Sequence, residues 1–265
     1  MEITSSKIKD YAKSLGIDMV GITSAELFNN AENSNYTSAV VALFPYYVGK
    51  AKKANLSKYT YAKDYHIVAK DYLEKIAKHF SFENYEIHAD IGPSIDRELA
   101  INAGLCFKGK NTMAINEKYG SYFFIGYIVC DESLEFDIPC KNVCIDCGRC
   151  VSACPGGAIR DDGTLDIEKC ASHISQKKGD LTADEIELIK KTGLCFGCDI
   201  CQNVCPHNES AEITPIKEFK ENLITSLSVS ELEGLSNKSF KEKYNDRAFS
   251  WRGKNVLVRN LKILD

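Results

Sequence analysis

Apolar positions over residues 1–135 follow strand and helix periodicities in turn. The run 39–44 is apolar at every position, as is typical of a strand buried on both faces. Strands are expected over 18–22, 39–44, 85–90, 114–116 and 122–130. Helices are expected over 5–15, 25–30, 64–80 and 98–103. This alternation predicts an α/β or α+β domain.

The pattern weakens beyond residue 135. Helices are expected over 167–174, 183–191 and 256–263. Between Pro206 and Asn245 the chain is polar, rich in Lys and Glu, and shows little periodicity. We therefore expect residues 1–135 to form the first domain, 136–215 a second, and 216–265 an extension that packs on the core.

Composition narrows the class of protein. A chain of 265 residues suits one or two domains, and its net charge of −4 argues against non-specific nucleic-acid binding by the whole surface. A local basic groove stays open. The N-terminus has no export-signal pattern, and no apolar run is long enough for a membrane span. Twelve Cys in such a chain predict a cytoplasmic protein that binds metal.

Two cysteine runs share the spacing C-x2-C-x2-C-x3-C-P. They are Cys144, Cys147, Cys150 and Cys154-Pro155, then Cys195, Cys198, Cys201 and Cys205-Pro206. In the bacterial ferredoxin run, three close thiolates hold one [4Fe–4S] cluster and the Cys before Pro ligates the other. Disulfides would require a secreted chain, and zinc sites usually pair C-x2-C groups. The sequence therefore predicts a ferredoxin-like domain with two [4Fe–4S] clusters.

The segment 144–205 offers one thiol more than two clusters with four thiolates each require. Cys170 and Cys195 are the alternatives, and we favour Cys170 because it lies in the first turn of a predicted helix. The first cluster would then take Cys144, Cys147, Cys150 and Cys205. The second would take Cys154, Cys170, Cys198 and Cys201. Cys106, Cys130 and Cys140 have no partner spacing and are interpreted as ordinary core or surface thiols.

The cysteine runs and several other stretches of the chain resemble the epoxyqueuosine reductases. These are cobalamin- and iron–sulphur-dependent enzymes of the tRNA queuosine pathway, related in chemistry to reductive dehalogenases. Besides the cysteine runs and Lys169-Cys170, the similar stretches are 58–66, 90–97, 103–112, 120–124 and Arg259-Asn260. The family continues into a helical-repeat domain that helps to hold tRNA, so this chain resembles a short form.

The resemblance implies a cobalamin-reductase-like first domain in which Asp90 donates a proton. Its position at the end of a predicted strand is also where α/β sheets gather their ligands, although a turn or helix-cap role is the alternative. The implied cobalamin-binding residues are Tyr59, Lys63, Asp64, His66, Arg97, Phe107, Gly109, Lys110, Asn111 and Thr112. Tyr65 is expected beside them. Without the resemblance, 109–112 would be a hairpin turn and 63–66 the solvated start of a helix.

Three functions remain open at this point. The favoured one is a cobalamin-dependent reductase, in which the clusters pass electrons to cobalt and the substrate is epoxyqueuosine in tRNA or a small molecule. The alternatives are a two-cluster electron-transfer protein without corrinoid and a reductive activator of another corrinoid enzyme. The expected partners are an electron donor such as ferredoxin or flavodoxin and a tRNA or small-molecule substrate. A membrane is not expected, and the chain is expected to be a monomer or homodimer.

Overall fold

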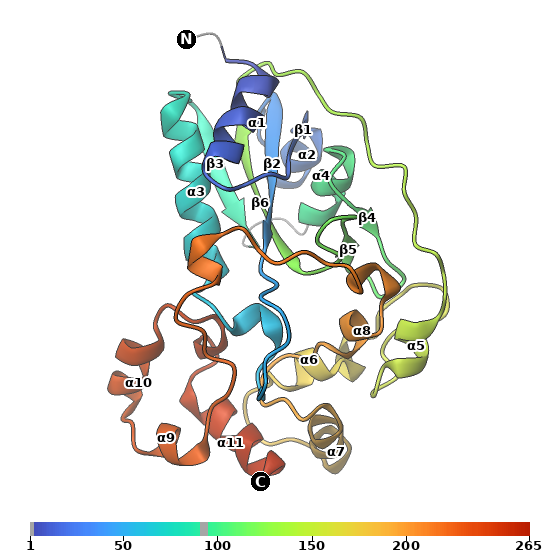
Figure 1. Cartoon of the computed structure of the whole chain (residues 1–265), viewed down its shortest axis with the longest axis vertical. Helices are drawn as coiled ribbons and strands as arrows, with labels where there is room; N and C mark the ends of the chain where they lie inside the picture. Colours follow the sequence, from blue (N-terminus) through green and yellow to red (C-terminus); the bar gives the residue numbers. More distant parts are fainter. Residues whose placement is uncertain (1–2, 91–94) are drawn as a thin grey trace.

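A four-stranded antiparallel sheet forms the centre of the first domain in a computed structural model that describes residues 3–90 and 95–265 (Figure 1). Its strands lie in the order β1-β2-β6-β3. Their bounds are β1 Val20–Ser24, β2 Ser38–Pro45, β3 Tyr85–Ala89 and β6 Phe123–Cys130. The mixed α/β fold class predicted from the sequence is confirmed, in its α+β form.

Helices cover both faces of this sheet. On one face lie α1 (Ser5–Ser14) and α3 (Tyr65–His79), and on the other lie α2 (Glu26–Glu32) and α4 (Asp96–Asn102). Alternate side chains of β2 enter the two cores, and every residue of the strand is buried. The continuous apolar run therefore predicted a strand buried on both faces correctly.

The strand directions correct one part of the sequence argument. Every neighbouring pair in the sheet is antiparallel, with Pro45 opposite Phe123 and Ala89 opposite Gly126. The edge beyond Asp90 thus combines the carboxyl ends of β2 and β3 with the amino end of β6. The rule that ligands gather at the carboxyl ends of parallel strands therefore does not apply to this sheet. Asp90 does, however, follow a strand as predicted.

Short helices and turns carry the cysteine runs. These are α5 (Arg149–Ala153), α6 (Ala171–Ile174), α7 (Ala183–Thr192) and α8 (Ile200–Asn203), with 3-10 turns at Ile167–Lys169 and Pro206–Asn208. The helix expected over 167–174 is therefore interrupted, because Cys170 is extended (φ −76°, ψ 120°) and caps α6. The expected 109–112 turn joins β4 (Phe107–Lys108) to β5 (Ala114–Ile115).

Residues 216–265 are more helical than their sequence suggested. Besides α11 (Lys254–Leu264), they form α9 (Val229–Glu233), α10 (Asn237–Tyr244) and 3-10 turns at Lys217–Phe219 and Ala248–Ser250. Their apolar side chains share a core with Leu56, Tyr61, Cys195 and Phe196. Because this core is built from distant parts of the chain, residues 216–265 on their own show only a weak apolar periodicity. A further 3-10 turn covers Lys58–Thr60. The three-part domain division stays a prediction.

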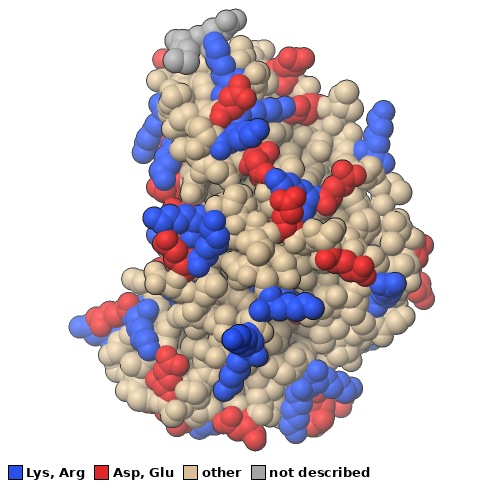
Figure 2. All heavy atoms as spheres, in the orientation of Figure 1, with Lys and Arg blue, Asp and Glu red and all other residues tan. Residues whose placement is uncertain are grey.

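Charged side chains of both signs are interspersed over the face drawn in Figure 2. This mixture agrees with the small net charge of −4. Within residues 3–90 and 95–265, no helix is both long and apolar enough to cross a membrane.

Candidate functional site

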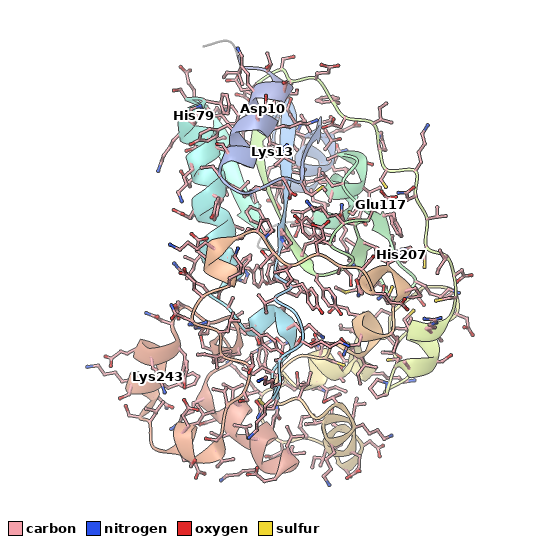
Figure 3. The ribbon with its side chains drawn as sticks, viewed as in Figure 1. Asp10, Lys13, His79, Glu117, His207 and Lys243 are labelled. Atoms are coloured by element: carbon pink, nitrogen blue, oxygen red, sulfur yellow. The ribbon has the colours of Figure 1, made fainter. Side chains whose placement is uncertain are left out.

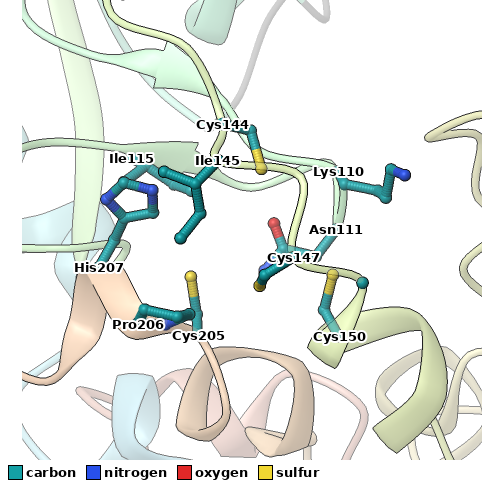
Figure 4. Close-up of a pocket in the computed structure, with 11 residues that line it drawn as sticks. Lys110, Asn111, Ile115, Cys144, Ile145, Cys147, Cys150, Cys205, Pro206 and His207 are labelled. Atoms are coloured by element: carbon teal, nitrogen blue, oxygen red, sulfur yellow. The ribbon is translucent and has the colours of Figure 1, made fainter.

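Four thiols from two distant segments line a narrow pocket beside the β4–β5 hairpin (Figure 4). Cys144 and Cys147 lie in the loop before α5, Cys150 lies in α5, and Cys205 follows α8. Cys147 is exposed to solvent, whereas Cys150 is buried. Burial raises the pKa of Cys205, and the thiolates of Cys144, Cys150 and Cys147 raise it further. These four residues are the set expected from the ferredoxin spacing.

The other four expected ligands line a second and larger cavity. They are Cys154, Cys170, Cys198 and Cys201. Burial, followed by repulsion from Cys198, Cys170 and Cys154, raises the pKa of Cys201 to about 12. The backbone N–H of Ala158 donates a hydrogen bond to Cys154 Sγ at 3.3 Å, a contact that would stabilise a thiolate ligand.

Cys195 lies apart from both sets of thiols. It is fully buried in the core with Leu56, Phe196 and Leu257, and burial raises its pKa to about 12. The structure therefore brings Cys170 into a group of four thiols and places Cys195 elsewhere. Within the described ranges, no three His, Cys, Asp or Glu side chains converge tightly enough for a single metal ion. In a cubane each thiolate binds its own iron, so such close convergence is not required.

Buried polar side chains tie the cysteine loops to the rest of the fold. Asp199 accepts hydrogen bonds from the Ser57 hydroxyl and, at 2.9 Å, from the backbone N–H of Lys58. Gln202 donates to the hydroxyl of Tyr46 at 3.1 Å and to the carbonyl of Ser121 at 2.9 Å. The loops that carry Cys198, Cys201 and Cys205 are thus connected both to the segment 57–58 and to the edge of the sheet.

Asn260 makes a third such connection, from the C-terminal helix. Its Nδ2 donates to the carbonyls of Ser175, at 2.7 Å, and Cys195, at 2.8 Å, and the residue is fully buried. Ser175 follows α6, and Cys195 begins the loop that carries Cys198. One amide group therefore holds together the two segments that supply Cys170 and Cys198.

We expect Asn260→Ala to lower the free energy of unfolding by about 2–4 kcal/mol, because two buried carbonyl groups lose their donor. Thermal unfolding of the holoprotein measures this. Asn255→Ala, an exposed position on the same helix, is the matched control and should leave the melting temperature close to wild type. Equal melting temperatures for both variants would contradict the role assigned to Asn260.

The larger cavity has a volume of about 990 Å³ and extends from the second group of thiols to the edge of the sheet. Among the expected cofactor-binding residues, those that line it are Tyr59, Asp64, His66, Arg97, Asn111 and Thr112, together with Asp90. Lys110 lies instead in the pocket of the first four thiols, paired with Asp146. Lys63, Phe107 and Gly109 are not among the residues that line either space, and Phe107 packs against His207. His207, which is labelled in Figure 3, lies in the 3-10 turn Pro206–Asn208.

Asp90 has a defined set of polar neighbours in this cavity. Its backbone is left-handed (φ 57°), a conformation that Asp tolerates better than most residues. The Tyr65 hydroxyl donates a hydrogen bond to Asp90 Oδ2, and His66 Nε2 lies 4.0 Å from the same oxygen. A hydrogen bond from His66 Nδ1 to Asp64, at 2.7 Å, raises the pKa of His66. The Asp90 carboxyl group therefore lies beside two other side chains that can carry a proton.

Asp96 is a third carboxyl group in the cavity, besides Asp64 and Asp90. Burial raises its pKa to about 6, and the negative charge of Asp90 contributes to the rise. Because the pKa is higher in the folded than in the unfolded chain, the folded state binds this proton more tightly. The associated stability is complete below the unfolded pKa of 3.8 and is lost as the pH rises through about 6.

We expect Asp96→Asn to match wild type in melting temperature at or below about pH 3.8 and to exceed it increasingly as the pH rises to about 7.5, since the amide never ionises. After allowance for solvent screening, the gain in free energy of unfolding at about pH 7.5 should be about 1–2 kcal/mol. Differential scanning fluorimetry across this range measures it. A pH-independent difference would contradict the raised pKa.

Two buried polar atoms near the thiols have no hydrogen-bond partner among the described residues. Asn111 is 4% exposed, lines both the thiol pocket and the cavity, and has an unpaired Nδ2; His207 Nε2 in the thiol pocket is the other. An unpaired buried donor is costly unless a bound group satisfies it. Together with two sets of four thiols and a cavity at the upper end of the usual range for ligand sites, these atoms fit bound cofactors.

Several cavity residues were not identified from the sequence. Tyr65 was expected nearby but not as the partner of Asp90, while Phe123, Phe124 and Trp251 were not expected at all. The ring of Phe124 stacks on Tyr65 with centroids 3.8 Å apart. The amino end of β6 was predictable as a strand, but its place at the cavity depends on the antiparallel order of the sheet.

Comparison with known proteins agrees with this geometry. Residues 143–208 match the family model of a 4Fe-4S double cluster binding domain, so the chain contains such a domain. An epoxyqueuosine reductase of Lactococcus garvieae is 36% identical over 219 residues, which cover 79% of this chain and 61% of the relative. The epoxyqueuosine reductase of Bacillus anthracis is 30% identical, over 94% of this chain and 77% of the relative.

Solved structures give the same result. Epoxyqueuosine reductase from Streptococcus thermophilus has a TM-score of 0.80 and 28% identity, over 98% of this chain and 80% of its own. An epoxyqueuosine reductase solved with a tRNA-Tyr epoxyqueuosine-modified stem loop has a TM-score of 0.83, 26% identity and the same coverage. A catabolic reductive dehalogenase, at 19% identity and a TM-score of 0.55 over 80% of this chain and 33% of its own, shares the fold. The chain belongs to the epoxyqueuosine reductase family, a family of oxidoreductases.

Proposed function

We propose that this chain is an iron–sulphur, cobalamin-dependent reductase that acts on epoxyqueuosine in the anticodon loop of tRNA. The observation that carries the proposal is the cavity of about 990 Å³, whose lining includes four thiols together with Asp90, Tyr65 and His66. Similar proteins are named epoxyqueuosine reductases, and one was solved with a modified tRNA stem loop. These names support the substrate proposed here.

We assign the cluster ligands by the grouping of thiols. Cys144, Cys147, Cys150 and Cys205 would hold the first cluster, and Cys154, Cys170, Cys198 and Cys201 the second. A corrinoid in the cavity would contact Tyr59, Asp64, His66, Arg97, Asn111 and Thr112. When bound, the clusters supply single electrons and the corrinoid supplies a strongly reducing cobalt centre.

The chain's own contribution is the supply of a proton. Conversion of the epoxide to an alkene breaks both carbon–oxygen bonds, consumes two electrons and two protons, and releases water. Asp90 gives one proton to the departing oxygen, and the other comes from solvent. The hydrogen bond from Tyr65 orients the carboxyl group. His66, with its raised pKa, lies 4.0 Å from the same oxygen, so its positive charge would stabilise the Asp90 carboxylate that remains after proton transfer.

The first cluster is the entry point for electrons in this proposal. Cys147 is exposed, and the neighbouring side chains of Val143 and Ile145 are 76% and 58% exposed. An apolar surface beside a cluster ligand suits transient docking of a small carrier, and we propose a ferredoxin or flavodoxin as the donor. The second cluster would pass the electrons on, since its thiols line the cavity.

The direct test is single-turnover reduction of an RNA stem–loop that carries epoxyqueuosine, by the anaerobic holoprotein with a chemical reductant. We expect mass spectrometry to show loss of one oxygen atom, and only in samples with both iron and corrinoid. Conversion without corrinoid would contradict the cobalamin part of the proposal. Conversion of the free nucleoside alone would indicate a small-molecule substrate instead.

A further inference from the structure

Trp251, the chain's only tryptophan, lies on the wall of the large cavity and is 59% exposed. Tryptophan is usually well buried, so an indole group left open beside a cavity calls for a ligand. It immediately follows the 3-10 turn Ala248–Ser250, whose Ala248 lines the same cavity and whose Phe249 is fully buried.

The indole ring is held in place before any ligand binds. Its Nε1 donates to Gln176 Oε1 at 3.0 Å, and Gln176 Nε2 donates in turn to the carbonyl of Ser172 at 3.0 Å. The preceding turn is fixed because buried Arg247 donates to the carbonyl of Tyr61 at 3.3 Å. A rigid aromatic side chain loses little conformational entropy when it binds a partner.

Arg252 covers one face of this ring. Its guanidinium carbon lies 3.6 Å from the centroid of the indole. Its Nε is buried without a hydrogen-bond partner, and no carboxylate in the described part of the chain forms an ion pair with Arg252. The arginine therefore presents a positive charge that has no ion-pair partner among the described residues, directly beside an exposed aromatic surface.

We propose that Trp251 and Arg252 form a subsite for one nucleotide of a single-stranded RNA loop. The free indole surface stacks on the base, and the guanidinium group contacts the adjacent phosphate. Aromatic rings that stack on unpaired bases, next to cations that contact the backbone, are the general means by which proteins bind single-stranded nucleic acid. The subsite rests on the proposed function, because it would hold a loop nucleotide while a neighbouring one enters the cavity.

The experiment measures the anisotropy of a fluorescein-labelled anticodon stem–loop RNA titrated with anaerobic holoprotein. Trp251→Ala should weaken binding roughly 10- to 100-fold, as expected for the loss of one stacked base. Trp251→Phe keeps an aromatic face and should stay within about threefold of wild type. Ile213→Ala is the matched control, because Ile213 is equally exposed, at 59%, but is not among the residues that line the cavity.

The salt dependence of RNA affinity distinguishes the contribution of Arg252 from that of Trp251. Arg252→Gln should reduce the slope of log affinity against log salt by about 0.7, the value for one phosphate contact on a single strand. Trp251→Ala should leave that slope unchanged, because stacking releases no counterion. Iron and cobalt contents are measured for each variant.

Each outcome has one meaning. If wild type binds the stem–loop and Trp251→Ala binds it equally well, the subsite is wrong and the proposed substrate stands. If Trp251→Ala loses cobalt and its RNA affinity falls only in proportion to the cobalt lost, the indole supports the cofactor and the subsite is also wrong. If wild type does not bind the stem–loop at all, the proposed tRNA substrate fails, and the subsite fails with it.

Discussion

Asp90→Asn is expected to reduce turnover by about 100- to 10,000-fold, the usual contribution of a positioned general acid. The amide keeps the shape of the side chain but cannot deliver a proton. Since the Asp90 side chain is 63% exposed, its replacement should leave the fold, the iron content and corrinoid binding unchanged. Single-turnover rates on the epoxyqueuosine stem–loop, with metal analysis of the same samples, measure both effects.

Two controls define what Asp90 does. Tyr65→Phe removes the hydrogen bond to Asp90 but leaves the carboxyl group, so it should cause a smaller loss than Asp90→Asn. Asp71→Asn, which removes an exposed carboxylate on α3 paired with Lys75, should have no effect. Wild-type turnover in Asp90→Asn would remove this residue from the mechanism.

Cys170→Ala is expected to lower the iron content from about eight to about four atoms per chain, because one cluster loses a ligand. Cys195→Ala should keep about eight, since Cys195 is buried in the apolar core with Leu56 and Phe196 rather than with the other thiols. Iron analysis after anaerobic reconstitution compares the two variants. Loss of iron in Cys195→Ala together with full iron in Cys170→Ala would reverse the assignment.

The crossed arrangement of ligands has its own test in the same series. Cys205→Ala should damage the cluster held by Cys144, Cys147 and Cys150, and Cys154→Ala the cluster held by Cys198 and Cys201. Electron paramagnetic resonance of the reduced variants identifies which cluster signal survives. The same surviving signal in both variants would contradict the exchange of ligands between the two runs.

Local sequence signals were sufficient for much of the fold. The strand β2 and the helix α3 were predictable because their apolar periodicities match the surfaces they bury. The antiparallel order of the sheet was not predictable, because it depends on long-range pairing of β6 between β2 and β3. The helices α9 and α10 were missed because each is short and buries only one side of itself against a core built from distant residues.

Local sequence signals likewise predicted only part of the candidate site. The thiols were predictable, because ligand spacing is a local property of the chain. The partnership of Tyr65 with Asp90 was not, since it depends on how α3 packs against β3. Trp251 gave no signal as a cavity residue, because its position depends on contacts of the C-terminal segment with Tyr61 and Gln176.

The most direct test of the central claim is metal analysis of the chain after anaerobic reconstitution with iron, sulphide and a cobalamin, followed by gel filtration. A reductase of the proposed kind should retain about eight iron atoms and about one cobalt atom per chain. Its visible spectrum should shift towards reduced cobalt when a low-potential reductant is added. About eight iron atoms without cobalt would contradict the proposed cofactor and would favour a two-cluster electron carrier.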